Sequence, residues 1–191
     1  MSELFSYKMF RTFIYIILII SHPFSGCVNK EPQTEKFPRI QSVVPLSLTE
    51  EHKTLLNLIH KISTRPDSSG RVAIKLYELL QHHFKEEENY VLPPLGLLSQ
   101  LVKGEQPADA EQVIALTEKL KDQMQHMDVE HQMVRAYLNE LKTASEKDTE
   151  VLKLEQELSK HAQMEEEILF PTALLIGEHL KLLKEKPSGS K

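Results

Sequence analysis

Apolar side chains recur at spacings of three and four residues along most of the chain after residue 48. This is the period of helices that bury one face. Three runs rich in turn-forming or charged residues, 65–70, 104–109 and 144–148, interrupt the pattern. It therefore predicts an all-α fold. The expected helices are long ones between the breaks and a shorter amphipathic one at the end: residues 49–64, 71–92, 108–143, 149–170 and 172–186.

Two histidine–glutamate pairs stand at matching places in this pattern. His83 precedes Glu87 by four residues, and His161 precedes Glu165 by four. Both stretches continue with apolar residues eight and nine positions after the histidine and a proline at the tenth. Residues four apart lie on one face of a helix, about one turn apart. Each pair can therefore direct an imidazole and a carboxylate at one point.

The repetition extends toward the amino terminus. A Glu-His dipeptide stands 31 residues before His83 and another stands 30 residues before His161; their histidines are His52 and His131. The two halves of the chain are thus offset by 78 or 79 residues. Duplication of this kind usually produces two similar units that pack on each other. We expect an up-down-up-down four-helix bundle built from two repeated helical hairpins, with a short C-terminal helix.

The duplicated histidines are expected to meet in the bundle. The two histidines of each hairpin stand at nearly equal sequence distances from the loop between its helices, which brings them to one level. Four imidazoles and two carboxylates suit two borderline cations such as iron. Each carboxylate could bridge cations about 3.5–4 Å apart. The predicted metal ligands are His52, His83, Glu87, His131, His161 and Glu165.

These residues also have a simpler interpretation. A lone histidine on an apolar face is usually a hydrogen-bonded core residue, and a run of glutamates usually faces solvent. However, Glu87 and Glu165 fall on apolar helix faces, where an unpaired carboxylate is costly, and the twofold recurrence favours a metal site. The neighbouring acids, including Glu88 and Glu166, are interpreted as outer acids, although either could replace the predicted ligand beside it.

The two His-x-x-x-Glu-Glu motifs, each ending in proline and each preceded by Glu-His, resemble those of the hemerythrin-like (HHE cation-binding) domain family. The resemblance covers roughly residues 48–171. It implies a four-helix bundle that holds two iron ions per chain in a non-haem, oxo- or hydroxo-bridged centre. It places the family's ligands on the same six residues.

One position departs from the family. Hemerythrins proper carry two histidines four residues apart on the third helix, but the residue four before His131 is Met127. His126 is five before it, which is about 140° around a regular helix instead of about 40°. His126 would be a ligand only if the helix were overwound or bulged there; otherwise it is exposed or lies outside the ligand set.

Composition restricts the classes of partner and cofactor. The formal charge is −5, from 23 Lys and Arg against 28 Asp and Glu, and no basic tract stands out. Nucleic acid is therefore an unexpected partner. The single cysteine, Cys27, excludes a disulfide, a cysteine-based zinc site and an iron–sulfur cluster within one chain.

Residues 1–26 have the features of a signal peptide, because basic residues precede an apolar run over 13–20 that is too short to span a membrane. The following Phe-Ser-Gly-Cys resembles the lipobox of bacterial lipoproteins, apart from Phe24. The resemblance implies lipidation of Cys27 and a lipid-anchored protein of the bacterial cell envelope, facing the periplasm or the exterior. The alternative is an ordinary signal peptide or a short anchor. The remaining expected parts are a flexible tether over 27–47, the hemerythrin-like domain over 48–186 and a disordered tail over 187–191.

Three functions are compatible with such a centre. The first is a binding protein that binds or senses oxygen or nitric oxide, or holds iron, at the cell envelope. The second is a di-iron redox enzyme of the oxidase, peroxidase or nitric oxide reductase type. The third is a bundle in which metal serves only to join the helices. No Ser/His/Asp arrangement or phosphate-binding loop is visible in the sequence, and the binding interpretation is preferred to the enzymatic one.

Overall fold

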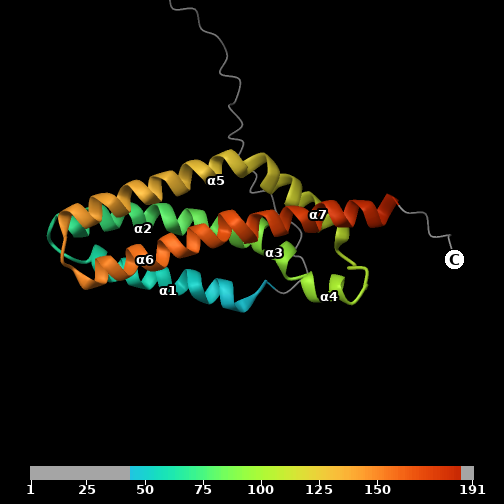
Figure 1. The fold of residues 1–191 in the computed structure, drawn as a ribbon, viewed down its shortest axis with the longest axis horizontal. Coiled ribbons are helices and arrows are strands. Elements are labelled where there is room, and N and C mark those ends of the chain that lie inside the picture. Colours follow the sequence, from blue (N-terminus) through green and yellow to red (C-terminus); the bar gives the residue numbers. More distant parts are fainter. Residues whose placement is uncertain (1–43, 186–191) are drawn as a thin grey trace, which may run out of the picture. The chain divides into compact units, whose positions relative to one another are not determined.

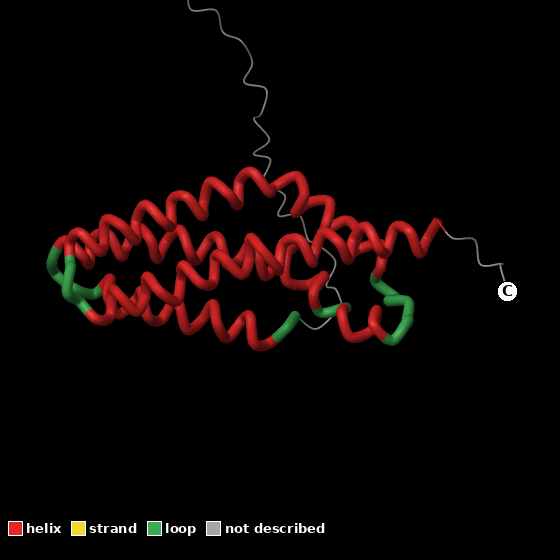
Figure 2. The backbone as a smooth tube through the Cα atoms, in the orientation of Figure 1, coloured by secondary structure: helices red, strands yellow, loops and turns green. Residues whose placement is uncertain are grey.

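A computed structural model of the chain describes residues 44–185, which are helical apart from short connections (Figures 1 and 2). The predicted all-α class is confirmed for these residues. The elements are α1 (Leu46–Ser63), α2 (Ser68–Glu86), the π-helical η1 (Glu87–Val91), α3 (Leu92–Leu95), α4 (Leu98–Val102), α5 (Ala110–Ala144), α6 (Thr149–Met164), the π-helical η2 (Glu165–Leu169) and α7 (Phe170–Glu185).

Several predicted features lie outside the described residues: the signal peptide, lipidation of Cys27, nearly all of the tether over 27–47 and the tail over 187–191. Among the helices within 44–185, none is both long enough and apolar enough to cross a membrane.

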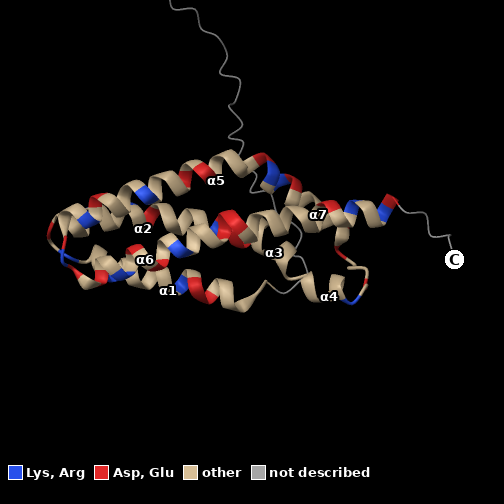
Figure 3. Ribbon diagram, in the orientation of Figure 1, with Lys and Arg blue, Asp and Glu red and all other residues tan. Residues whose placement is uncertain are grey.

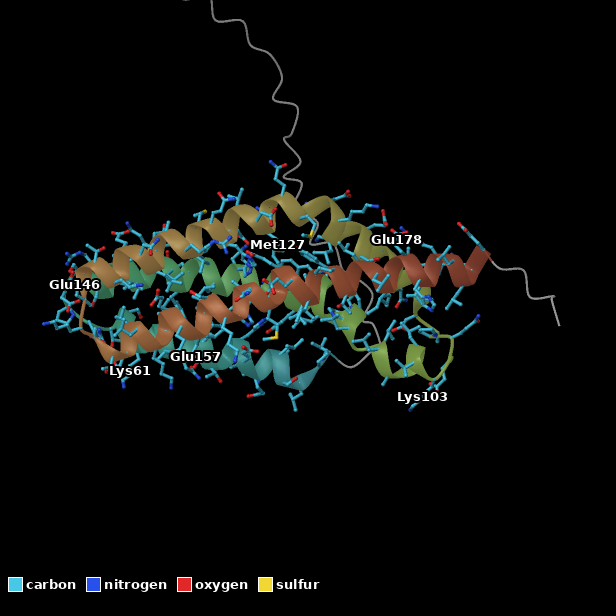
Figure 4. All side chains as sticks on the ribbon, viewed as in Figure 1. Lys61, Lys103, Met127, Glu146, Glu157 and Glu178 are labelled. Carbon is cyan, nitrogen blue, oxygen red and sulfur yellow. The ribbon has the colours of Figure 1, made fainter. Side chains whose placement is uncertain are left out.

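The long helices pack on one another in a bundle. α1 packs on α2 and α6, and α5 packs on α2, α6 and α7. Figure 1 shows the α1–α2 and α5–α6 loops at the same end of this bundle, and Figure 4 labels Lys61 and Glu146 there.

Charged side chains join the two loops at that end. Arg65, which follows α1, lies 2.6 Å from Oδ2 of Asp148 and 2.6 Å from Oε2 of Glu150. Asp148 also caps α6, because its Oδ1 accepts hydrogen bonds from the backbone N–H groups of Glu150 and Val151. Asp67 caps α2 in the same way and accepts from the N–H of Gly70. These contacts fix where α2 and α6 begin and hold the α1–α2 and α5–α6 loops together.

Two apolar cores lie on either side of the predicted ligands. Near the loops, α1, α2, α5 and α6 bury Leu, Ile, Val and Phe side chains between residues 55 and 62, 72 and 84, 134 and 141, and 151 and 158. The other core joins η1 and α3 to the first half of α5 and to α7. Along each long helix, the predicted ligands come between these two sets of apolar residues. We call the two sets the loop-end core and the far core.

The expected helices 71–92 and 149–170 were predicted to end just before Pro93 and Pro171. The helical structure continues past both prolines, so these predicted ends were wrong. η1 and α3 continue α2 to Leu95, with Pro93 and Pro94 in the first turn of α3, and α7 continues α6 through Pro171 to Glu185. Each proline follows a five-residue π-helical segment. There a fresh α-helical turn begins, and a missing N–H is tolerated at that position.

Candidate metal centre

The structure brings all six predicted ligands together between the loop-end core and the far core. They come from six elements: α1, α2, α5 and α6 supply histidines, and η1 and η2 each begin with one of the two glutamates. Every one of them is at most 2 % exposed. Figure 3 shows acidic residues gathered at the junction of α6 and α7, where η2 lies. We refer to these six residues as the buried centre: His52, His83, Glu87, His131, His161 and Glu165.

The first group of potential ligands lies on the α1–α6 side. His52 Nε2 is 3.4 Å from Glu87 Oε2 and 4.0 Å from Glu165 Oε1. His161 Nε2 is 2.6 Å from the same oxygen of Glu165. One atom from each of these four residues lies within 4.8 Å of all the others, so the group could hold a metal ion.

The second group lies on the α2–α5 side. His83 Nε2 is 3.5 Å from Glu87 Oε1, and His131 Nε2 is 3.3 Å from Glu165 Oε2. The two imidazoles approach each other to 3.0 Å between their Nε2 atoms. One atom from each of these four residues also lies within 4.8 Å of all the others, so this group could hold a second ion.

Both carboxylates belong to both groups. Glu87 directs Oε2 at His52 and Oε1 at His83. Glu165 directs Oε1 at His161 and Oε2 at His131. Two carboxylates that each offer one oxygen to either side are suited to bridging a pair of cations.

Several donor atoms of the buried centre lack a hydrogen-bond partner. Among the described residues, the buried side-chain nitrogen and oxygen atoms that lack a hydrogen-bond partner all belong to the buried centre. Leaving such atoms unsatisfied costs free energy. Bound cations would satisfy most of these atoms. The orphaned atoms are His52 Nε2, His161 Nδ1 and Nε2, and both oxygens of Glu87 and of Glu165.

A glutamate faces the remaining ring nitrogen of each histidine. With the distance from Nδ1 to the carboxylate oxygen, the pairs are His52–Glu88 (3.0 Å), His131–Glu166 (2.7 Å), His83–Glu130 (2.8 Å) and His161–Glu51 (3.4 Å). We call Glu51, Glu88, Glu130 and Glu166 the supporting glutamates. Such partners orient a ligating imidazole and make it a better donor. All four histidines are thereby held with Nε2 toward the two bridging carboxylates.

The supporting glutamates follow the sequence duplication. Glu88 and Glu166 are the acids five residues after the motif histidines, and they lie outside the ligand groups, as interpreted from the sequence. Sequence reasoning missed the roles of Glu51 and Glu130. The available signal was the duplicated Glu-His dipeptide: each of its glutamates faces the histidine of the neighbouring helix.

The two bridging carboxylates differ electrostatically without a metal. Burial and the adjacent charge of Glu165 hold the pKa of Glu87 well above its usual value. Burial would also raise the pKa of Glu165, but its ion pairs with His131 and His161 outweigh burial and lower it. Reciprocally, Glu165 raises the pKa of both histidines against the opposing effect of their burial. Each of these raised pKa values favours the protonated form of its group.

His126 does not join the buried centre. Its Nε2 lies 3.4 Å from Glu86 Oε2 and 3.4 Å from Glu130 Oε1, on the outer side of α5. α5 is α-helical without a π-helical segment, so His126 and His131 diverge as the regular helix requires. Met127 is fully buried in the far core instead, and Figure 4 labels it midway along α5.

A narrow apolar space adjoins the buried centre. It has no room for a water-sized molecule, and it borders His83, His131, His161 and Glu165. The rest of its lining comes mainly from apolar side chains of the loop-end core: Leu80, Phe84, Val134, Leu158 and Ala162.

Comparison of the chain with protein-family models, curated proteins and solved structures finds no match. The interpretation of the site therefore rests on its own donors and geometry. Buried histidine and glutamate groups in a helical bundle could hold metal ions here, and imidazole and carboxylate donors suit divalent transition metals.

Proposed function

We propose that this chain is a hemerythrin-like protein whose buried centre binds two iron ions. The observation that carries the proposal is the sharing of Glu87 and Glu165 between two groups of histidines, with one oxygen of each carboxylate on either side. The sequence motifs support it, because the duplication that relates His52 to His131 and His83 to His161 also relates one ligand group to the other. An up-down-up-down bundle of two repeated hairpins belongs to the same proposal.

Each iron ion would have four protein donors. His52 and His161 would hold one ion and His83 and His131 the other, with one oxygen from each bridging glutamate. Non-haem iron sites with few protein donors keep positions free for an external ligand. Two bridged iron ions would supply reversible electron exchange with a small diatomic molecule such as oxygen or nitric oxide.

The surroundings favour binding of such a molecule over enzymatic turnover. Leu80, Val134 and Leu158 pack beside the histidines and leave no room for a water molecule there. A redox enzyme would benefit from a tyrosine at the centre. However, the Tyr90 hydroxyl donates a hydrogen bond to Glu86, and Tyr137 packs against the loop-end core. We therefore infer that the protein binds or senses oxygen or nitric oxide, or holds iron.

Metal analysis and spectroscopy test this proposal. The full-length chain, produced in iron-rich medium, is expected to contain about two iron ions per chain. Its visible absorption should change on aeration and return on deoxygenation. One ion per chain, or a preference for zinc under these conditions, would contradict the di-iron proposal. Irreversible oxidation that consumes an added reductant would instead favour the redox enzyme.

We also propose that a lipid on Cys27 anchors the chain in the bacterial cell envelope, on the periplasmic or exterior side. The support is the sequence of residues 1–27 alone. Cys27→Ser should move the protein from the detergent-extracted membrane fraction to the soluble fraction, because a thioether-linked lipid requires the thiol. Unchanged fractionation would mean that residues 1–26 act as an uncleaved anchor or that the lipobox assignment is wrong.

A further inference from the structure

A second group of metal-ligating side chains lies beside the buried centre, and the proposed function does not use it. It consists of one His-x-x-x-Glu pair on α2 and another on α5. The histidine side chains are 62 % and 44 % exposed, whereas the glutamates are 24 % and 6 % exposed. We call this group the rim cluster: His82, Glu86, His126 and Glu130.

The donor atoms of the rim cluster stand at the spacing that one cation requires. Glu130 Oε1 is 3.5 Å from His82 Nδ1 and 3.4 Å from His126 Nε2. His126 Nε2 is also 3.4 Å from Glu86 Oε2. Two ligand atoms bound tetrahedrally to one Zn²⁺, at about 2.0–2.1 Å each, lie about 3.3–3.4 Å apart. The cluster therefore needs little rearrangement to receive an ion.

The carboxylates of the rim cluster are held by side chains behind them. The hydroxyl of Tyr90, whose ring is buried, donates to Glu86 Oε2 at 3.1 Å. Glu130 directs its second oxygen, Oε2, at Nδ1 of His83, 2.8 Å away. Hydrogen bonds of this kind fix ligating carboxylates in metal sites. The exposed histidines thus face two acids whose positions are already set.

The rim cluster is not a by-product of the duplication that produced the buried centre. Under the duplication, Glu51 on α1 occupies the position equivalent to Glu130 on α5. The positions equivalent to His82, Glu86 and His126 are occupied by Lys160 and Met164 on α6 and Ser47 on α1. The full set of four donors therefore occurs between α2 and α5 and is not repeated between α6 and α1, which a general requirement of the fold does not explain.

We propose that the rim cluster is a third metal site, which binds one divalent transition-metal cation such as Zn²⁺ or Co²⁺ at the surface of the bundle. Two imidazoles and two carboxylates form a donor set of the kind that Zn²⁺ accepts. Glu130 would bind this ion with Oε1 and support His83 of the buried centre with Oε2. The side chain of Glu130 would thus connect the third ion to the buried centre.

Titration of the full-length chain with Co²⁺ tests the third site by comparing variants. The wild-type chain should bind one equivalent more than the double variant His82→Asn/His126→Gln. This difference does not depend on how many ions the buried centre takes, so the test is separate from the di-iron proposal. In the wild type, the additional Co²⁺ ion should show the visible absorption of a four-coordinate site. In the variant, the affinity for this ion should fall at least 100-fold.

A matched control replaces two histidines outside both sites. His60→Asn/His179→Gln changes two exposed imidazoles and should leave the number of equivalents unchanged. If the rim double variant lowers the melting temperature of the metal-free chain, the Glu86→Gln variant replaces it as the deciding test. Its affinity for the additional Co²⁺ ion should be at least tenfold lower than that of the wild type. Equal stoichiometry and affinity in the wild type and the deciding variant would overturn the third site.

Discussion

Glu165→Gln should leave the buried centre unable to retain metal, while the chain still folds. Glu165 offers Oε1 to His161 and Oε2 to His131, so it contributes to both ligand groups. Glutamine keeps the shape but loses the negative charge, and it replaces one oxygen by an amide nitrogen that is a poor ligand. We expect at least a 100-fold loss of affinity, more than the 10–100-fold typical of losing a partner behind a ligand.

The measurement is the metal content of the purified full-length chain after dialysis. Glu167→Gln is the matched control, because it removes the same charge two residues along the chain. The side chain of Glu167 is exposed and accepts a hydrogen bond from Gln163. Glu166→Gln should lie between them, since Glu166 bonds Nδ1 of His131 and is no ligand. Equal losses in all three variants would mean that the acids act through general charge, and the bridging geometry would be wrong.

Loading with iron should raise the melting temperature strongly, and His131→Ala should remove most of that rise. Without metal, the buried centre keeps carboxylates and imidazoles away from water, and several of their atoms lack a hydrogen-bond partner, which destabilises the fold. An ion that binds only the folded chain stabilises it by about 4 kcal/mol at a free concentration 1,000 times its dissociation constant. At about 2–4 °C per kcal/mol, one such ion raises the melting temperature by about 8–16 °C.

Calorimetric scans of the loaded and metal-free forms provide the comparison. His131→Ala should lower the melting temperature of the metal-free chain much less than that of the loaded chain. The loaded chain loses a metal ligand, whereas the metal-free chain loses only a buried polar ring. His60→Ala should change both forms alike and only slightly, since His60 is exposed and contacts Tyr77 at the surface. If His131→Ala keeps both the iron content and the metal-dependent rise, α5 supplies no ligand at that position.

The positions of the six residues of the buried centre could be predicted because they depend on local geometry. Helical spacing places His83 with Glu87, and the duplication then requires a second pair in the same relation. The exclusion of His126 follows from the same regularity, since α5 turns about 100° per residue without a bulge.

Two features could not be predicted because they depend on contacts between helices. The π-helical segments begin at the bridging glutamates, and no periodicity in the sequence indicates that the helices continue through Pro93 and Pro171. The double role of Glu130 depends on where its two oxygens point across the α2–α5 contact. Sequence spacing places Glu130 beside His131 but says nothing about which neighbouring helix it faces.

The separation of the loop-end core from the far core has a consequence for cooperativity. Apolar contacts hold each core together, but the layer between them consists of polar residues, and several of their atoms lack a hydrogen-bond partner without an ion. Regions joined by few apolar contacts open as separate units. Iron would couple the two units so that they unfold together, and its loss would release one from the other. The quantity of iron in the cell would then set how long this chain resists proteolysis, as well as how much of the buried centre is occupied.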